Sequence, residues 1–292
     1  MPFLESTDAP VLAIGAAGVD VVARLESETQ AGTSTPAQIR FSFGGVARNV
    51  AENLARLGHR VHLVSAVGSG YFGDQLIKQI SDAGVDTSAV LRTSDRTGSY
   101  VAVFSEREKV LALDDMRASR AVTPAHLRDH YHLFKRASLC FLDANLPQAT
   151  LKTAFSLAKR ARLPVIADPT SATLASRLEP YLDRIHMLTP NSAEAVIYCQ
   201  QPFCDAEKDQ AMDATKALVS RGVSVVILSL AEFGVCYATS ETSGYIPAIR
   251  TEVVDPTGAG DALTAAVIFS MLNEIPLDDA VRLGVSAASL TL

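Results

Sequence analysis

The stretch Val253-Val254-Asp255-Pro256-Thr257-Gly258-Ala259-Gly260-Asp261-Ala262 decides the predicted fold. Two β-branched residues lead into a Pro-Thr turn, and two glycines and an acid then precede a run of small and apolar residues that reaches Met271. This order predicts the end of a strand, a glycine-rich turn and the first turn of a buried helix.

The glycine-rich turn has the composition of an anion-binding site. Because Gly258 and Gly260 lack a Cβ, backbone N–H groups can approach a ligand closely at the positive end of the helix dipole. The same dipole favours an ionised Asp261, which can then accept a proton. An anion site beside a base is what phosphoryl transfer to a hydroxyl requires. The alternative is a capped helix N-terminus, which explains Asp261 but not both glycines.

Two other nucleotide-binding patterns are excluded by the same stretch. A dinucleotide fingerprint requires a third glycine where Leu263 stands, and no Gly-Lys-Ser/Thr sequence occurs anywhere in the chain. The pattern therefore favours neither a Rossmann dehydrogenase nor a Walker-type site.

Composition narrows the class of protein further. The chain has 292 residues, of which 48% are hydrophobic, which suffices for one large α/β domain. Its net charge of -6 and the lack of a dense basic run argue against nucleic-acid and anionic-membrane partners. No apolar stretch reaches the about 18 residues of a membrane span. Sparse cysteines without paired metal ligands, and three histidines (126, 130 and 132) without companions, predict a reduced cytoplasmic protein with no metal cluster.

Strands and helices alternate along most of the chain, which predicts a parallel sheet with right-handed crossovers. The first buried strand is Val11 to Gly15. We expect polar residues to gather at the carboxyl ends of the strands, where open α/β sheets bind ligands. Each could individually be a cap or a turn former, and their shared edge is the stronger indication. They are Asp20, Asn145, Asp168, Asn191, Ser229 and Asp261.

Two segments depart from this alternation, at about residues 18–43 and 96–114. Both contain short alternating strands, so we expect them to form a small β lid on a single domain that spans 1–292. Asp115 leaves the lid and is expected to face the substrate. Asp20 follows the first strand, where it either binds sugar hydroxyls or caps a turn.

A second glycine-rich stretch, Gly44-Gly45-Val46-Ala47-Arg48-Asn49, begins a predicted helix. The two glycines allow close backbone approach, and Asn49 can offer a donor and an acceptor to a substrate hydroxyl. A tight turn is the alternative interpretation of the glycine pair.

These two stretches together resemble the two signatures of the ribokinase-like PfkB carbohydrate kinases. The resemblance covers nearly the whole chain and implies a three-layer α/β/α fold with a mostly parallel central sheet and a small β-sheet lid. In detail the chain is most similar to the pseudouridine kinases of that family. That similarity rests on the amino-acid sequence of residues 44–58 and on three short motifs: Leu113-Asp114-Asp115-Met116, Asp143-Ala144-Asn145 and Asp168-Pro169-Thr170-Ser171.

The resemblance also implies roles for individual residues. Asp261 would be the general base, and the backbone of Gly258, Ala259 and Gly260 would bind the migrating phosphoryl group. Glu194, with Asn191, would help to position Mg²⁺, mostly through water. A K⁺ or other monovalent cation near Asp255 is common in the family. The acceptor would contact Asp20, Gly44, Gly45, Asn49, Asp115 and Asn145, and ATP would contact Asn191, Ser229, Gly234, Thr257, Gly258 and Gly260.

The resemblance therefore implies an ATP- and Mg²⁺-dependent kinase that phosphorylates a primary hydroxyl, with pseudouridine as the expected acceptor and a homodimer built through the lid. The turn Gly15-Ala16-Ala17-Gly18-Val19-Asp20 departs from the pseudouridine kinases, because Ala16 and Gly18 offer no side-chain hydrogen bonds. A ribokinase or another sugar or nucleoside kinase is the alternative within the family, and a non-catalytic binding protein is the alternative outside it. The chain ends within a predicted late helix, so we expect an incomplete C-terminus.

Overall fold

A large, mostly parallel sheet forms the centre of the protein. The computed structural model describes residues 9–29, 32–105, 108–201, 203–251 and 256–292. In these ranges the sheet order is β14-β13-β12-β11-β10-β9-β1-β4-β5, with β6 also paired to β4. Only the β12-β13-β14 edge is antiparallel. The strands are β1 (Val11–Ile14), β4 (Val61–Gly68), β5 (Val85–Asp86), β6 (Val90–Thr93), β9 (Leu139–Asp143), β10 (Val165–Asp168), β11 (Met187–Leu188), β12 (Val225–Ser229), β13 (Val235–Ala238) and β14 (Ser243–Ile246).

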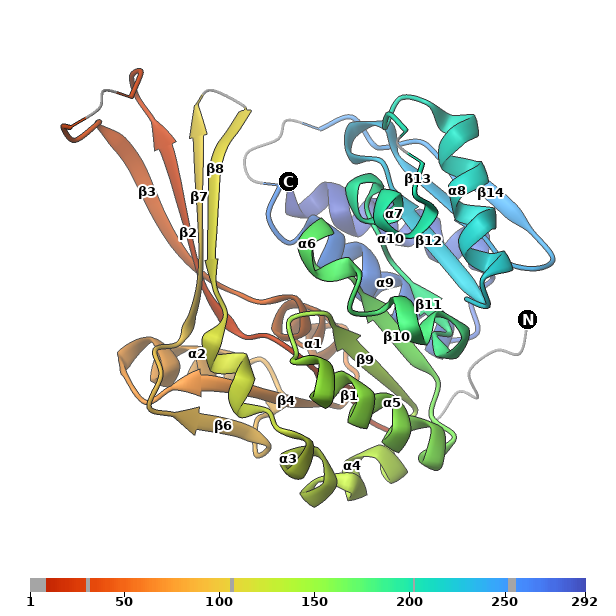
Figure 1. Ribbon diagram of the computed structural model, residues 1–292, viewed down its shortest axis with the longest axis horizontal. Helices are drawn as coiled ribbons and strands as arrows, with labels where there is room; N and C mark the ends of the chain where they lie inside the picture. Colours follow the sequence, from red (N-terminus) through yellow and green to blue (C-terminus); the bar gives the residue numbers. More distant parts are fainter. Residues whose placement is uncertain (1–8, 30–31, 106–107, 202, 252–255) are drawn as a thin grey trace.

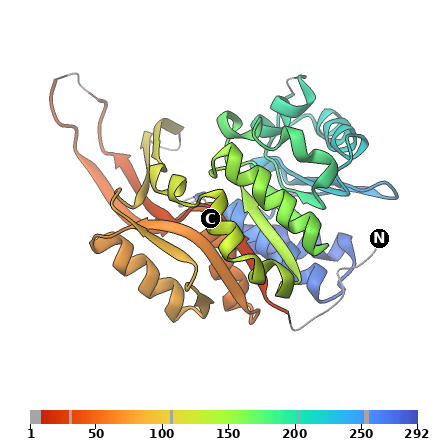
Figure 2. The same cartoon turned by 60° about the horizontal axis from the view of Figure 1, so that its bottom comes forward.

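Helices cover both faces of this sheet, which confirms the predicted three layers (Figure 2). On β1, Val11 and Ala13 join one core cluster, whereas Leu12 and Ile14 join the other. One face carries α1 (Val46–Arg56), α2 (Tyr71–Asp82), α9 (Ala259–Leu272) and α10 (Leu277–Thr291). The other carries α3 (Pro124–Asp129), α4 (Tyr131–Arg136), α5 (Gln148–Ala161), α6 (Ala172–Ala175), α7 (Ser192–Cys199) and α8 (Lys208–Ser220). Three 3₁₀ helices, η1 (Arg117–Ala121), η2 (Glu179–Arg184) and η3 (Ala231–Phe233), lie in connections.

A separate four-stranded sheet forms the predicted lid and projects from the body of the protein (Figure 1). Its order is β3-β2-β7-β8, and β2 runs parallel to β7. The strands are β2 (Gly18–Leu25), β3 (Ala37–Gly44), β7 (Gly98–Ser105) and β8 (Glu108–Asp115). The lid has a small core of Val22, Ala102 and Phe104.

Glycines face one another across three strands where the lid joins the body. Gly18 pairs with Gly44 on one side and with Gly98 on the other. A Cβ on Gly18 would lie 2.7 Å from the carbonyl oxygen of Gly98, so side chains are excluded from this row.

Within the described ranges, no helix is long and apolar enough to cross a membrane. The four cysteines are free of disulfides.

Candidate active site

The glycine-rich turn begins α9 as the sequence predicts. Gly258 is the N-cap and has φ 83°, a left-handed conformation that favours glycine. Asp261 lies in the first turn of α9 with 9% of its surface exposed. The strand expected before the turn, and Asp255 with its expected cation contact, lie outside the described residues.

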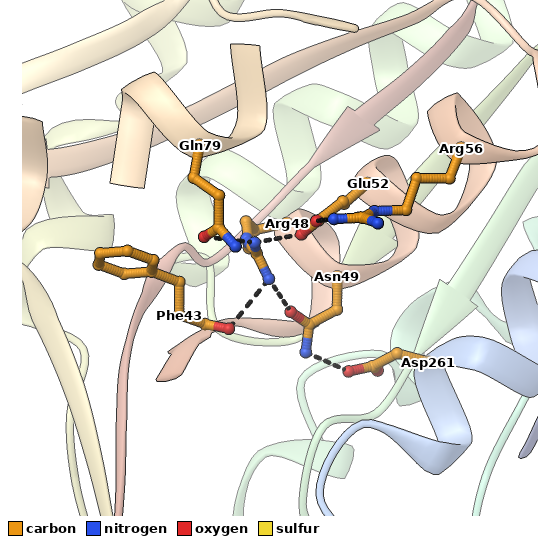
Figure 3. A network of polar contacts seen from close by, with 7 residues as sticks. All are labelled: Phe43, Arg48, Asn49, Glu52, Arg56, Gln79 and Asp261. Carbon is orange, nitrogen blue, oxygen red and sulfur yellow. Dashed lines mark hydrogen bonds and ion pairs between the residues drawn. The ribbon is translucent and has the colours of Figure 1, made fainter. Parts of the chain in front are cut away.

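Asp261 is held by a side chain from the other end of the chain. Nδ2 of Asn49 in α1 donates a hydrogen bond to Oδ2 of Asp261 over 2.7 Å (Figure 3). The amide oxygen of Asn49 in turn accepts a hydrogen bond of 2.8 Å from Nη1 of Arg48. The two glycine-rich stretches of the sequence therefore meet in one polar network.

The surroundings of Asp261 favour its protonated form. Burial raises the pKa of Asp261 well above its usual range, and the negative charge of Asp168 raises it further, while the hydrogen bond from Asn49 lowers it. We had expected the helix dipole to keep this carboxylate ionised, but burial outweighs that effect. A carboxylate with a raised pKa is a stronger base, which suits proton abstraction from a hydroxyl.

The glycine pair before α1 makes room for the neighbouring segments. Gly45 is the N-cap of α1 with φ 99°, and a Cβ there would lie 2.5 Å from the carbonyl oxygen of Ala16. A Cβ on Gly44 would overlap the carboxylate of Asp20. Asp20 is buried, but it is the third residue of β2 and does not lie at the carboxyl end of a central strand, as we had expected. The chain passes straight from the turn after β1 into the lid.

Asp143 is a site residue to which the sequence assigned no role of its own. This carboxylate at the end of β9 is fully buried and accepts hydrogen bonds from the N–H groups of Ala16 (2.7 Å), Ala47 (3.0 Å) and Asn145 (2.9 Å). It thereby ties together the turn after β1, the start of α1 and the end of β9. Asn145 is also buried, and its Nδ2 donates to Oγ1 of Thr170 over 3.4 Å.

A pocket of about 1260 Å³ opens beside the start of α9. It contains four of the residues expected to bind nucleotide, namely Asn191, Ser229, Gly234 and Gly260. Asn191 and Ser229 are neighbours there through a β-bridge. Thr257 lies between Pro256, which lines the pocket, and the N-cap of α9. Residues of α10 and the chain end form a further, mostly apolar wall: Val285, Ala288, Ser289 and Leu292.

Asn191 and Glu194 form a capping box at the start of α7. The Asn191 side chain accepts from the Glu194 N–H, and the Glu194 carboxylate accepts from the Asn191 N–H, both at 2.9 Å. The Asn-x-x-Glu spacing alone is enough to indicate this arrangement. Glu194 is buried, and burial together with the charge of Asp168 raises its pKa.

Asp168 and Glu194 suit a cation whose direct ligands are mainly water and phosphate oxygens. No cluster of three His, Cys, Asp or Glu side chains within the described ranges is arranged to hold a metal directly. Burial raises the pKa of Asp168, as it does that of Glu194, so a nearby positive charge would relieve both carboxylates. Mg²⁺ that keeps several waters and binds nucleotide phosphates fits this donor set.

Asp115 lies apart from the large pocket. It lines a small polar hollow of about 210 Å³ at the base of the lid, and the two cavities share no lining residue. Its carboxylate is bound by the guanidinium of Arg117, with Oδ1 2.8 Å from Nε, and this pairing lowers the pKa of Asp115 to about 2.

The family model for pfkB family carbohydrate kinases matches residues 8–292. The chain belongs to the PfkB family of carbohydrate kinases. It is 33% identical over 288 residues to the pseudouridine kinase of Escherichia coli, covering 97% of this chain and 90% of that one. It is 26% identical to a ribokinase of Lactococcus lactis, covering 97% and 90%. The resemblance found in the sequence is thereby confirmed at the level of the family.

The structure of this PfkB kinase resembles solved ribokinases. The Arabidopsis thaliana ribokinase complexed with ribose and ATP superimposes with a TM-score of 0.83 at 24% identity, covering 97% of this chain and 92% of the other. The predicted ribokinase-like α/β fold is therefore confirmed, and the protein is a member of a phosphotransferase family.

Proposed function

We propose that this PfkB kinase transfers the terminal phosphoryl group of ATP to a primary hydroxyl of pseudouridine, forming pseudouridine 5′-phosphate. The observation that carries the proposal is the placement of Asp261. It lies at the N-terminus of a buried helix, next to a pocket of about 1260 Å³ and in contact with Asn49 of the first glycine-rich stretch. We further propose that the whole chain acts as one catalytic unit.

Asp261 removes the proton of the acceptor hydroxyl as the hydroxyl oxygen attacks the γ-phosphorus of ATP, whose bond to the bridging oxygen breaks so that ADP leaves. Its raised pKa suits it to this step, and the N–H groups of Gly258, Ala259 and Gly260 stabilise the charge on the transferred group. Orienting the two reactants side by side supplies much of the remaining rate.

The acceptor site lies on the lid side of Asp261. Asp20 and Asn49 hold sugar hydroxyls, with Asn145 at the same edge of the sheet and the backbone of Gly44 and Gly45 close by. Asp115 contacts the acceptor only if Arg117 releases it, since the two side chains form an ion pair. ATP occupies the large pocket beside Asn191, Ser229, Gly234 and Thr257.

Cations complete the proposed site. Glu194 would help to hold Mg²⁺ with the nucleotide phosphates, mostly through water. Bound there, the cation would supply positive charge that offsets the developing charge on the phosphoryl group. A monovalent cation such as K⁺ near Asp255 and Thr257 is part of the same proposal, and so is a cytoplasmic location.

A ribokinase is the second candidate, and the turn after β1 weakens the case for the first. Ala16 and Gly18 offer no side-chain hydrogen bonds to a base or a sugar, and the similarity to the Lactococcus lactis ribokinase is what supports the second candidate. The 33% identity to the Escherichia coli pseudouridine kinase supports the first candidate.

We propose that the lid also forms a homodimer interface. Its two outer strands carry large apolar side chains that are exposed in the single chain, and Phe41 has 65% of its surface exposed. Exposed apolar patches of this kind mark protein interaction sites. The residues are Ile39 and Phe41 on β3, and Val110, Leu111 and Leu113 on β8.

The deciding experiment measures ATP consumption with pseudouridine, uridine, adenosine, ribose, fructose and fructose 1-phosphate, with Mg²⁺ and with or without K⁺. Turnover confined to pseudouridine supports the first candidate. Preference for ribose or another sugar retains the kinase mechanism and replaces the acceptor. Nucleotide binding without turnover of any acceptor would count against the catalytic proposal.

A further inference from the structure

Arg48 is a buried arginine at the centre of the polar network in Figure 3, with 5% of its surface exposed. Nη1 donates to the Phe43 carbonyl oxygen (2.9 Å) and to Oδ1 of Asn49 (2.8 Å), and Nη2 donates to Oε1 of Gln79 (3.2 Å). Nη2 also forms an ion pair with Glu52. Arg48 therefore contacts the end of a lid strand, helix α2 and the residue that holds Asp261.

The contact with Arg48 determines which way the Asn49 amide faces. A guanidinium has donors only, so the amide group of Asn49 must turn its oxygen toward Arg48. The NH₂ group then faces Asp261 and donates to Oδ2 over 2.7 Å. With an apolar side chain at position 48, the Asn49 amide could adopt either orientation. In one of them Oδ1 of Asn49 would face Oδ2 of Asp261, and the two oxygens would repel each other.

The orientation of the amide in turn fixes the carboxylate of Asp261. An Nδ2–H donor occupies Oδ2 and favours the ionised form, which leaves Oδ1 to accept a proton from an acceptor hydroxyl. We propose that Arg48 is a positioning residue for the base, acting through Asn49 and making no contact with the reactants. This inference rests on the proposed role of Asp261.

If Arg48 served only the stability of the fold, its loss would lower kcat whether or not Asn49 is present. Glu52 accepts hydrogen bonds not only from Arg48 but also from Arg56, whose Nε lies 3.0 Å from Oε1. The loss of Arg48 therefore leaves Glu52 with a charged partner, and the fold is expected to survive it. Arg56 shares Glu52 with Arg48, has no contact with Asn49 among the hydrogen bonds of the described residues, and provides a matched control.

The test is a double-mutant cycle between Arg48→Met and Asn49→Ala, with Arg56→Met as control. Turnover is followed with whichever acceptor the wild-type protein phosphorylates, so a negative result with pseudouridine affects only the choice of acceptor. We expect Arg48→Met to lower kcat about 10- to 100-fold, the value of a hydrogen bond to a charged group, while KM for ATP changes less than about threefold. In the Asn49→Ala background, the same substitution should change kcat less than about threefold.

Three results would overturn the inference. One is a kcat of Arg48→Met that matches the wild type, and another is an equal loss in the presence and absence of Asn49. The third is a comparable loss of kcat in Arg56→Met. Thermal unfolding with and without ATP establishes that each variant is folded. If Arg48→Met does not fold, the double-mutant cycle is measured with Arg48→Lys instead. The lysine ammonium group cannot bind Asn49 and Phe43 in the same fixed geometry.

Discussion

Nδ2 of Asn49 and Oδ2 of Asp261 lie 2.7 Å apart although 212 positions separate the two residues in the chain. Asn49 lies in the first turn of α1 and Asp261 in the first turn of α9, and these two helices pack on the same face of the sheet. The contact places the proposed base at the boundary between the lid side, where the acceptor is expected, and the nucleotide pocket.

Substituting Asp261→Asn should remove the base and keep its shape. We expect kcat to fall by about 10²- to 10⁴-fold, the usual contribution of a general base, with little change in substrate affinity. Steady-state kinetics and calorimetric binding of ATP measure the two quantities. Asp82→Asn, an exposed change on α2, serves as the control. Near-normal turnover of Asp261→Asn would remove Asp261 from the base role.

Gly260 and Gly284 form a matched pair of helical glycines. Apart from its chain neighbours and the backbone of its own helix, nothing lies within 4 Å of a Cβ built on Gly260, which lines the pocket, whereas a Cβ on Gly284 would lie 2.9 Å from Val267. Gly260→Ala should therefore keep or raise stability by up to about 1 kcal/mol, because alanine favours helices, yet lower kcat/KM for ATP at least about tenfold. Gly284→Ala should destabilise by about 1–3 kcal/mol and retain activity.

Urea unfolding and ATP kinetics on both variants provide the measurement. If Gly260→Ala were fully active, close approach of a ligand to this backbone would not be needed for catalysis.

The pH dependence of stability should reveal the buried acids. Burial raises the folded-state pKa of Asp168 and of Glu194, so each favours folding while protonated. That contribution is complete below the ordinary carboxyl pKa of about 4 and is lost as pH rises through the raised values. Burial lowers the pKa of three histidines, which has the opposite effect on the pH dependence: His59, His126 and His186.

The difference in unfolding free energy between the wild type and Asp168→Asn separates the effect of the buried acids from that of the histidines, which both proteins share. In buffer free of Mg²⁺ and nucleotide, the free energy of unfolding of the wild type should fall relative to that of Asp168→Asn between pH 5 and pH 8. Urea midpoints at each pH measure it. A difference that does not vary with pH would contradict the raised pKa of Asp168.

Asp143 should be required for folding more than for chemistry. Its carboxylate is fully buried and accepts three backbone hydrogen bonds, so Asp143→Ala leaves three buried donors without a partner. We expect a loss of at least about 3 kcal/mol in unfolding free energy, with Asp143→Asn losing less because its amide oxygen still accepts. Urea denaturation measures both variants, and a loss below about 1 kcal/mol for Asp143→Ala would refute this role.

The lid dimer can be tested by placing charges on its apolar face. Phe41→Glu and Leu113→Glu should each convert a dimer into monomers, because burying an unpaired carboxylate costs more than the apolar contact contributes. Analytical ultracentrifugation gives the mass in solution. Leu290→Glu introduces the same charge at an exposed apolar residue of α10, which is not part of the lid sheet, and should leave the mass unchanged. A monomeric wild type would end the proposal.

Local patterns in the sequence predicted the parts of the fold that local physics determines. The glycines and acid at residues 258–261 predicted a glycine-rich turn before a helix, and alternation predicted the lid strands. Hydrogen bonds between residues that lie far apart in the sequence could not be predicted in this way. Asp143 ends an apolar strand, and nothing near it indicates hydrogen bonds to Ala16 and Ala47, which lie 127 and 96 positions away.

The predictions for the position of Asp20 and the ionisation of Asp261 were wrong for two other reasons. Asp20 was expected after a central strand, but the strand ends at Ile14 and a new strand begins at Gly18, because the chain turns directly into the lid. Burial decides the protonation of Asp261, and burial depends on the assembled fold and not on neighbouring residues. The capping box of Asn191 and Glu194 could have been found from its spacing.

The row formed by Gly44, Gly18 and Gly98 marks where three lid strands meet the body, and the side chains of Asp20 and Met116 fill the space that its missing Cβ atoms leave. Asp20 and Met116 are therefore the side chains that must fit the row, whereas lid residues further along the strands can vary with little adjustment of the body. The row is therefore a natural boundary for recombination. A lid taken from a kinase with another acceptor, joined at these three positions and after Asp115 at the end of β8, would exchange the lid residues of the acceptor site while the phosphate-binding helix is inherited intact.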